Sequence, residues 1–155
     1  MTAGTIVLRG RKVVGGRAEG AALVTTQTIS GWAGIDVMTG TIVEPRHELR
    51  GCSFKDKILV FPGAKGSSGW SMYFHIARLV GSAPKAMVFT RMTTRIALSA
   101  VVMHAPAITD LDRDPFSLIT TSDWVVVDAD AGVVEVTKEK DRGEGIADQS
   151  LQVAR

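Results

Sequence analysis

Cysteine is almost absent from this sequence. Its 155 residues include a single cysteine, Cys52. One thiol cannot form an intrachain disulfide, and one thiolate cannot by itself hold an iron–sulfur cluster or a structural zinc ion, because these sites need several ligands. We therefore expect Cys52 to be a small packed residue that follows a turn.

Strong charge of one sign and long apolar runs are also missing. Lysine and arginine (18) nearly balance aspartate and glutamate (16), which gives a formal net charge of +2. Without a long basic run or basic and aromatic residues in alternation, a nucleic-acid surface is not expected. No apolar stretch approaches the roughly 18 residues of a membrane span, and residues 1–9 lack the apolar core of a signal peptide. We expect a cytoplasmic protein with no membrane partner.

What is present is typical of one globular domain. A chain of this length can bury roughly 70% of its unfolded surface without disulfides or metals. Hydrophobic residues make up 45% and charged residues 22%, which are ordinary proportions. Sixteen glycines indicate many turns.

Short apolar runs between glycines predict strands at both ends of the chain. The expected strands are residues 6–8, 12–14 and 21–24, a pair within 35–43 around Thr39-Gly40, and a hairpin of 124–127 and 133–136 that turns at 131–132.

The centre of the chain has the pattern of a strand–helix–strand unit. Residues 57–61 form a continuous apolar run, as in a strand buried on both faces. A loop rich in glycine and serine follows at 63–69. Apolar residues then recur at helical spacing over 72–80 and stop at Gly81. Residues 86–89 form a second buried strand, which a right-handed crossover makes parallel to the first.

A second helix and a third strand complete this unit. Thr93 or Thr94 can cap a helix that runs to about His104, and residues 107–109 form a short strand. The fold class is therefore α/β, layered β/β/α. Beyond residue 137 the periodicity is lost, so we assign 1–137 to the domain and 138–155 to a frayed, charged tail or a partner contact.

The loop at 63–69 is the one segment that indicates chemistry. It joins the carboxyl end of a strand to the start of a helix, where free N–H groups and the helix dipole favour an anion. Gly66 allows close approach of a ligand, and Ser67 and Ser68 supply hydroxyls. The loop matches neither a Walker A nor a dinucleotide-binding pattern. The alternative interpretation is a tight turn in which Ser67 or Ser68 caps the helix.

Other candidate groups lack a catalytic pattern. No nucleophile elbow or acid–histidine–serine arrangement accompanies His47, His75 or His104, which we expect to be surface or packing residues. Asp110, Asp112 and Asp114 alternate as in a calcium loop, but proline replaces its sixth-position glycine and threonine its twelfth-position glutamate. We expect a solvated turn there.

Three stretches together resemble the small subunit, or swivelling domain, of the aconitase X family. The first is Ile29–Asp36, followed by Thr39-Gly40. The second is His47-Glu48-Leu49-Arg50-Gly51, similar to the family's His-x-Leu-x-Gly. The third is Val60-Phe61-Pro62, which leads to Gly66-Ser67-Ser68.

The resemblance, which extends over roughly residues 4–137, implies a function. In this family the swivelling domain packs over a large subunit that carries an iron–sulfur cluster, of the 2Fe-2S or 4Fe-4S type, on its own cysteines. A serine of the Gly-Ser-Ser loop removes a proton from a small hydroxy-acid substrate, and water leaves. The match places that general base at Ser67, with Lys65, Gly66 and Ser68 binding the substrate. This chain would then bind no cofactor alone.

The resemblance leaves the substrate open. We expect cis-3-hydroxy-L-proline, because only Lys65 is a reliable cation near the loop and a phosphorylated substrate would need more. The alternatives are mevalonate 5-phosphate and a non-catalytic anion-binding module. The sequence departs from the family pattern at Trp32 and at Gly69-Trp70, where each tryptophan could pack in the core or line the cleft.

Overall fold

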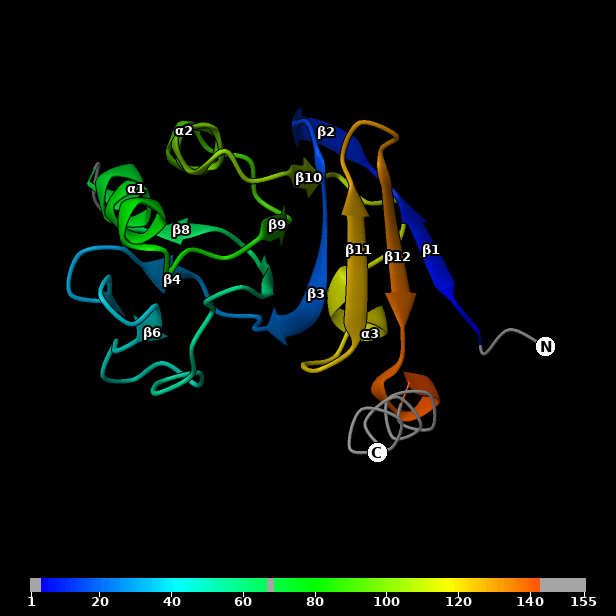
Figure 1. Cartoon of the computed structure of the whole chain (residues 1–155), viewed down its shortest axis with the longest axis horizontal. Helices are drawn as coiled ribbons and strands as arrows, with labels where there is room; N and C mark the ends of the chain where they lie inside the picture. Colours follow the sequence, from blue (N-terminus) through cyan, green and yellow to red (C-terminus); the bar gives the residue numbers. More distant parts are fainter. Residues whose placement is uncertain (1–3, 67–68, 143–155) are drawn as a thin grey trace, which may run out of the picture.

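A computed structural model describes residues 4–66 and 69–142 (Figure 1). Eight strands form its main sheet, and these are β1 (Ile6–Arg9), β2 (Arg11–Val14), β3 (Arg17–Val24), β7 (Ile58–Phe61), β9 (Ala86–Phe89), β10 (Ala107–Thr109), β11 (Trp124–Asp128) and β12 (Val133–Thr137). Their order in the sheet is β1-β12-β11-β3-β7-β9-β10-β2. The four strands β3, β7, β9 and β10 run parallel, and the remaining pairings are antiparallel.

Smaller elements surround the sheet. They are the parallel pair β4 (Ile29–Ser30) and β8 (Ala64–Lys65), the antiparallel pair β5 (Ile35–Asp36) and β6 (Thr41–Ile42), and the helices α1 (Trp70–Val80), α2 (Thr94–Met103) and α3 (Pro115–Leu118). None of the helices in the described ranges is long and apolar enough to cross a membrane.

The side chains of the central strands alternate between two hydrophobic cores. In β7, Leu59 and Phe61 join the core under α1 and α2, whereas Ile58 and Val60 join a second core. The second core also contains residues of β1, β11 and β12, so the antiparallel half of the sheet folds over the parallel half. Figure 1 shows the resulting layers, from the helices through β9 and β10 to β11, β12 and β1. The β/β/α prediction is confirmed.

The free edge of β1 is covered by the loop after β10. The N–H of Arg9 donates to Oδ1 of Asp112 over 3.0 Å, and the N–H of Asp112 donates to the carbonyl of Arg9 over 2.8 Å. The guanidinium of Arg113 reaches the carbonyl of Val7 at 2.6 Å. Three backbone groups of β1, the N–H and carbonyl of Arg9 and the carbonyl of Val7, therefore have partners in this loop.

The remaining aspartates of that loop also have structural roles. Asp110 forms an ion pair with Arg11 at 2.8 Å, and the carboxylate of Asp114 accepts from the N–H of Phe116 at the start of α3. The loop is therefore a hydrogen-bonded turn that holds β1 and α3.

The residues just beyond β12 contact the domain. Nζ of Lys138 lies 2.6 Å from Oδ2 of Asp123, whose side chain is 3% exposed, and Arg142 lies over the ring of Trp124. The boundary between domain and tail at residue 137 stays a prediction, since most of 138–155 lies outside the described residues. Within the described part, residues 138–142 are attached to the domain.

The Asp123–Lys138 pair predicts a pH-dependent contribution to stability. Burial raises the pKa of Asp123, but the ammonium of Lys138 and the N–H groups of Thr120 and Glu139 outweigh it, so the pKa is lowered. A lowered carboxyl pKa stabilises the fold above the unfolded-state pKa, and that contribution is lost as the pH falls through the folded-state pKa. We expect Lys138→Met to reduce the free energy of unfolding by roughly 1.5–3 kcal/mol at about pH 7 and by much less at about pH 2.

Urea unfolding of the variant at both pH values measures this effect. The exposed Lys140 provides a matched control, because Lys140→Met removes the same charge without removing a buried partner. Equal losses for the two variants at about pH 7 would contradict the assignment.

Candidate functional site

The loop at 63–69 runs from the carboxyl end of β7 to the start of α1. Gly63 and Gly66 have φ values of 148° and 85°, which side-chain-bearing residues rarely adopt. The N-cap of α1 is Gly69, with no side-chain hydrogen bond to the first turn. The N-cap position of α1 is therefore one residue after Ser68 and two after Ser67, the residues that the alternative interpretation places there. Ser67 and Ser68 themselves lie outside the described residues.

Trp70 anchors the helix directly after the two serines. Its side chain is 1% exposed and stacks on Phe74, with ring centroids 4.2 Å apart. Its indole N–H donates to the carbonyl of Ile29 over 2.7 Å, which ties the helix to β4. A Cβ atom on Gly31 would lie only 2.9 Å from Cα of Trp70, so a glycine is needed for this approach. Trp70 is a packing residue.

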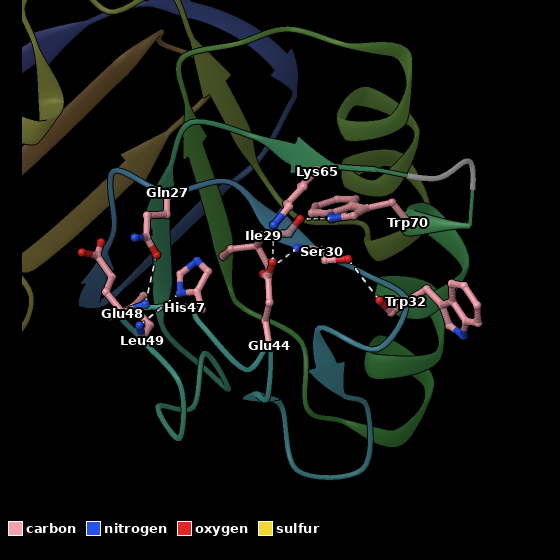
Figure 2. Close-up of polar contacts among 10 residues, drawn as sticks. All are labelled: Gln27, Ile29, Ser30, Trp32, Glu44, His47, Glu48, Leu49, Lys65 and Trp70. Carbon is pink, nitrogen blue, oxygen red and sulfur yellow. Dashed lines mark hydrogen bonds and ion pairs between the residues drawn. The ribbon is translucent and has the colours of Figure 1, made fainter.

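Trp32 differs from Trp70, because 68% of it is exposed. The backbone around it is fixed by the hydroxyl of Ser30, which donates to the carbonyl of Trp32 over 3.0 Å. Figure 2 shows its ring turned away from the other labelled side chains. Trp32 therefore contributes nothing to the core of the domain.

Lys65 is held by a carboxylate that the sequence analysis did not identify. Nζ of Lys65 lies 2.6 Å from Oε1 of Glu44 (Figure 2). Ser30 pairs with Lys65 where β4 runs beside β8, and the N–H of Ser30 donates to Oε2 of Glu44 over 3.4 Å. Burial raises the pKa of Glu44, but donation from Lys65 and Ser30 and the positive charge of Lys65 lower it overall. Glu44 therefore stays ionised and offsets much of the charge of Lys65.

A pocket of about 310 Å³ lies beside this ion pair. It is lined by Gln27, Thr28, Glu44, Arg46, His47 and Lys65. Of the substrate-binding residues predicted from sequence, Lys65 lines it and Gly66 does not, whereas Ser68 lies outside the described residues. Arg46 is a second cation at this site, and the sequence analysis missed it because no spacing relates residue 46 to the loop.

His47 is buried in the wall of this pocket, with 7% of its surface exposed. Its Nδ1 accepts from the N–H of Leu49 over 3.0 Å, so a neutral ring carries its proton on Nε2. That Nε2 is buried and has no hydrogen-bond partner among the described residues. His75 lies on α1 and His104 ends α2, and neither lines the pocket.

The donor set of this chain does not fit an iron–sulfur cluster. Within residues 4–66 and 69–142, no group of three or more histidine, cysteine, aspartate or glutamate side chains could hold a metal ion. Cys52 is the single cysteine, and its side chain is partly buried against the core under α1 and α2.

Comparison with known proteins identifies the class of this domain. The family model of the aconitase X swivel domain matches residues 7–136. A crystal structure of aconitase X from Thermococcus kodakaraensis, in its holo form, superposes with a TM-score of 0.79 at 37% identity, over 84% of this chain and 98% of that chain. The chain therefore belongs to the aconitase X swivel-domain family.

The names of similar proteins narrow the class further. A phosphomevalonate dehydratase small subunit from Methanocella arvoryzae is 36% identical over 130 residues, which is 84% of this chain and 98% of that protein. Another, from Archaeoglobus fulgidus, is 44% identical over 126 residues, which is 81% of this chain and 95% of that protein. This chain is thus the small subunit of an aconitase-X-type dehydratase.

Proposed function

We propose that this chain is the small subunit of a dehydratase that acts on mevalonate 5-phosphate, and that Ser67 is its general base. The observation that carries the proposal is the Gly66-Ser67-Ser68 sequence in the loop between β7 and α1, in a chain whose relatives are phosphomevalonate dehydratase small subunits. These names favour the alternative substrate over cis-3-hydroxy-L-proline, which the sequence alone favoured.

The reaction needs a base that removes a proton from the carbon next to the substrate carboxylate. The electrons of the broken C–H bond form the new C=C bond, and the hydroxyl of the adjacent carbon leaves as water. A serine hydroxyl acts as such a base only when its alkoxide is stabilised by positive potential. The start of α1 supplies such potential, because the helix dipole places partial positive charge there. No side chain reduces this potential, since the N-cap is Gly69 and the first turn has no acidic residue.

Lys65 contributes less to that potential than the sequence suggested. Its ammonium is paired with the ionised Glu44 at 2.6 Å, so its charge is largely balanced. Its role in the proposal is therefore to bind and orient the substrate beside Gly66, and stabilisation of the alkoxide depends on the helix and on the partner.

The partner in this proposal is a large catalytic subunit that carries the cluster on its own cysteines. When bound there, the cluster supplies a Lewis acid for the hydroxyl and carboxylate of the substrate. The small subunit supplies the loop that covers the substrate, and we expect the exposed Trp32, in the segment that follows β4, to contact the large subunit.

Activity of the assembled enzyme tests the proposal. The small and large subunits are co-expressed, purified together without oxygen, and supplied in turn with mevalonate 5-phosphate and cis-3-hydroxy-L-proline. We expect dehydration of the phosphorylated substrate and at least 100-fold lower kcat/KM for the amino acid, a difference of about 2.7 kcal/mol.

Two results would overturn the proposal. Efficient dehydration of cis-3-hydroxy-L-proline alone would restore the substrate that the sequence favoured. Tight binding of mevalonate 5-phosphate to the isolated chain by calorimetry, with no large subunit that co-purifies, would support a non-catalytic anion-binding module instead.

A further inference from the structure

Nε2 of His47 is the one buried side-chain nitrogen or oxygen that lacks a hydrogen-bond partner among the described residues. An N–H that is buried without an acceptor costs about 1–3 kcal/mol, and most such groups in folded proteins have a partner. The hydrogen bond from Leu49 fixes the ring, and Figure 2 shows the second nitrogen on the side away from Leu49, between the side chains of Gln27 and Glu44. The group therefore has a fixed direction, and its hydrogen-bonding capacity is not used by the described residues.

The other residues of the pocket favour an anionic acceptor. Arg46 and Lys65 bring two positive charges, and the one carboxylate, Glu44, is already engaged by Lys65 and the N–H of Ser30. The pocket volume of about 310 Å³ is several times the roughly 30 Å³ that one water molecule occupies, so the pocket can hold a polyatomic anion.

We propose that this pocket binds the phosphate group of the substrate, with Nε2 of His47 as a hydrogen-bond donor and Arg46 and Lys65 as its cations. The inference rests on the proposed function and adds the place of the phosphate. Lys65 lines the pocket and directly precedes Gly66 and Ser67, so a single substrate can reach from the pocket to the loop.

Entry of the phosphate requires a local movement. Nε2 is covered by its neighbours, so a side chain of the pocket wall must turn aside before an oxygen can reach it. The side chain of Lys65 is 58% exposed, and its ammonium is paired with Glu44 alone among the described residues, so the end of this side chain can shift at little cost. The ammonium of Lys65 has three N–H donors, so it can bind a phosphate oxygen while it stays paired with Glu44.

The test measures phosphate affinity in the assembled two-subunit enzyme. His47→Asn is the informative variant, because the asparagine oxygen can still accept from the N–H two residues later while no donor remains at the place of Nε2. We expect KM for mevalonate 5-phosphate, and the dissociation constant of inorganic phosphate measured by calorimetry, to rise roughly 10- to 100-fold. We expect kcat to change far less, and Arg46→Met to act in the same direction.

Matched controls separate this inference from the proposed function. Arg50→Met removes an exposed arginine of the same segment and is expected to leave phosphate binding unchanged.

Unchanged phosphate affinity in both His47→Asn and Arg46→Met would overturn the inference, even in an enzyme that dehydrates mevalonate 5-phosphate. If these two variants bound acetate more weakly but bound phosphate as before, the pocket would be assigned to a carboxylate, and the inference would also be overturned. If the unaltered enzyme bound phosphate here but did not dehydrate mevalonate 5-phosphate, the proposed function would fail and the anion site would stand.

Discussion

Ser67→Ala is expected to lower kcat of the assembled dehydratase by roughly 100- to 10,000-fold, the usual contribution of a general base. The alanine cannot accept the substrate proton, whereas the interactions that bind the substrate are retained. KM is therefore expected to change little. Steady-state kinetics of the co-purified subunits, with the cluster content matched to that of the unaltered enzyme, measure the effect.

Ser68→Ala is the matched control for this experiment. It removes the same hydroxyl one residue later, and we expect a loss of less than about tenfold, typical of a substrate hydrogen bond. If Ser68→Ala caused the larger loss, the base would be Ser68. If both variants retained full kcat, the loop would not carry the base at all.

Trp70→Ala is expected to reduce the free energy of unfolding of the small subunit by about 3–5 kcal/mol. The substitution removes a fully buried indole that stacks on Phe74, and it leaves the carbonyl of Ile29 without its donor. For a chain of this length each kcal/mol lowers Tm by about 2–4 °C, so a decrease of roughly 10 °C is expected in calorimetry of the isolated subunit.

Trp32→Ala provides the comparison for that result. The same side chain is lost from an exposed position, so we expect a change within about 0.5 kcal/mol of zero. Similar destabilisation by the two variants would contradict the packing described for α1. A Trp32→Ala subunit that is stable but assembles poorly with its partner would support the proposed contact.

The two tryptophans show what periodicity can and cannot predict. Each follows a glycine in a motif that resembles the family, and the sequence left both open between core and cleft. The structure buries Trp70 because it lies on the face of α1 that also carries Phe74 and Ala77. Trp32 lies in a turn, where no periodicity defines a face, so the sequence contains no signal for its exposure.

The strands and helices of the centre were predictable, since each is a local pattern. Residues 58–61 and 86–89 are apolar throughout because β7 and β9 are covered on both faces, and Gly81 ends α1 with a φ of 84°. The short elements β4, β8 and α3 were missed. Two paired residues, or a single helical turn after Asp114, are too short to produce a pattern.

The candidate site was predicted only where it is continuous in sequence. Lys65 and Gly66 were identified from the loop, but Glu44 lies 21 positions away and reaches Lys65 through the pairing of β4 with β8. His47 belongs to a motif that resembles the family, and the sequence predicts only that it packs or faces solvent. Its importance depends on which of its two ring nitrogens has a partner, which a sequence cannot show.

The loop that covers β1 limits how this subunit can meet other proteins. An uncovered outer strand is a template onto which another chain can add its own strand, and aggregation often starts there. In this domain Asp112 and Arg113 already occupy the backbone groups of Arg9 and Val7 on that side. Strand addition along this part of β1 is therefore hindered, and a neighbour that approaches this side must recognise it largely through side chains.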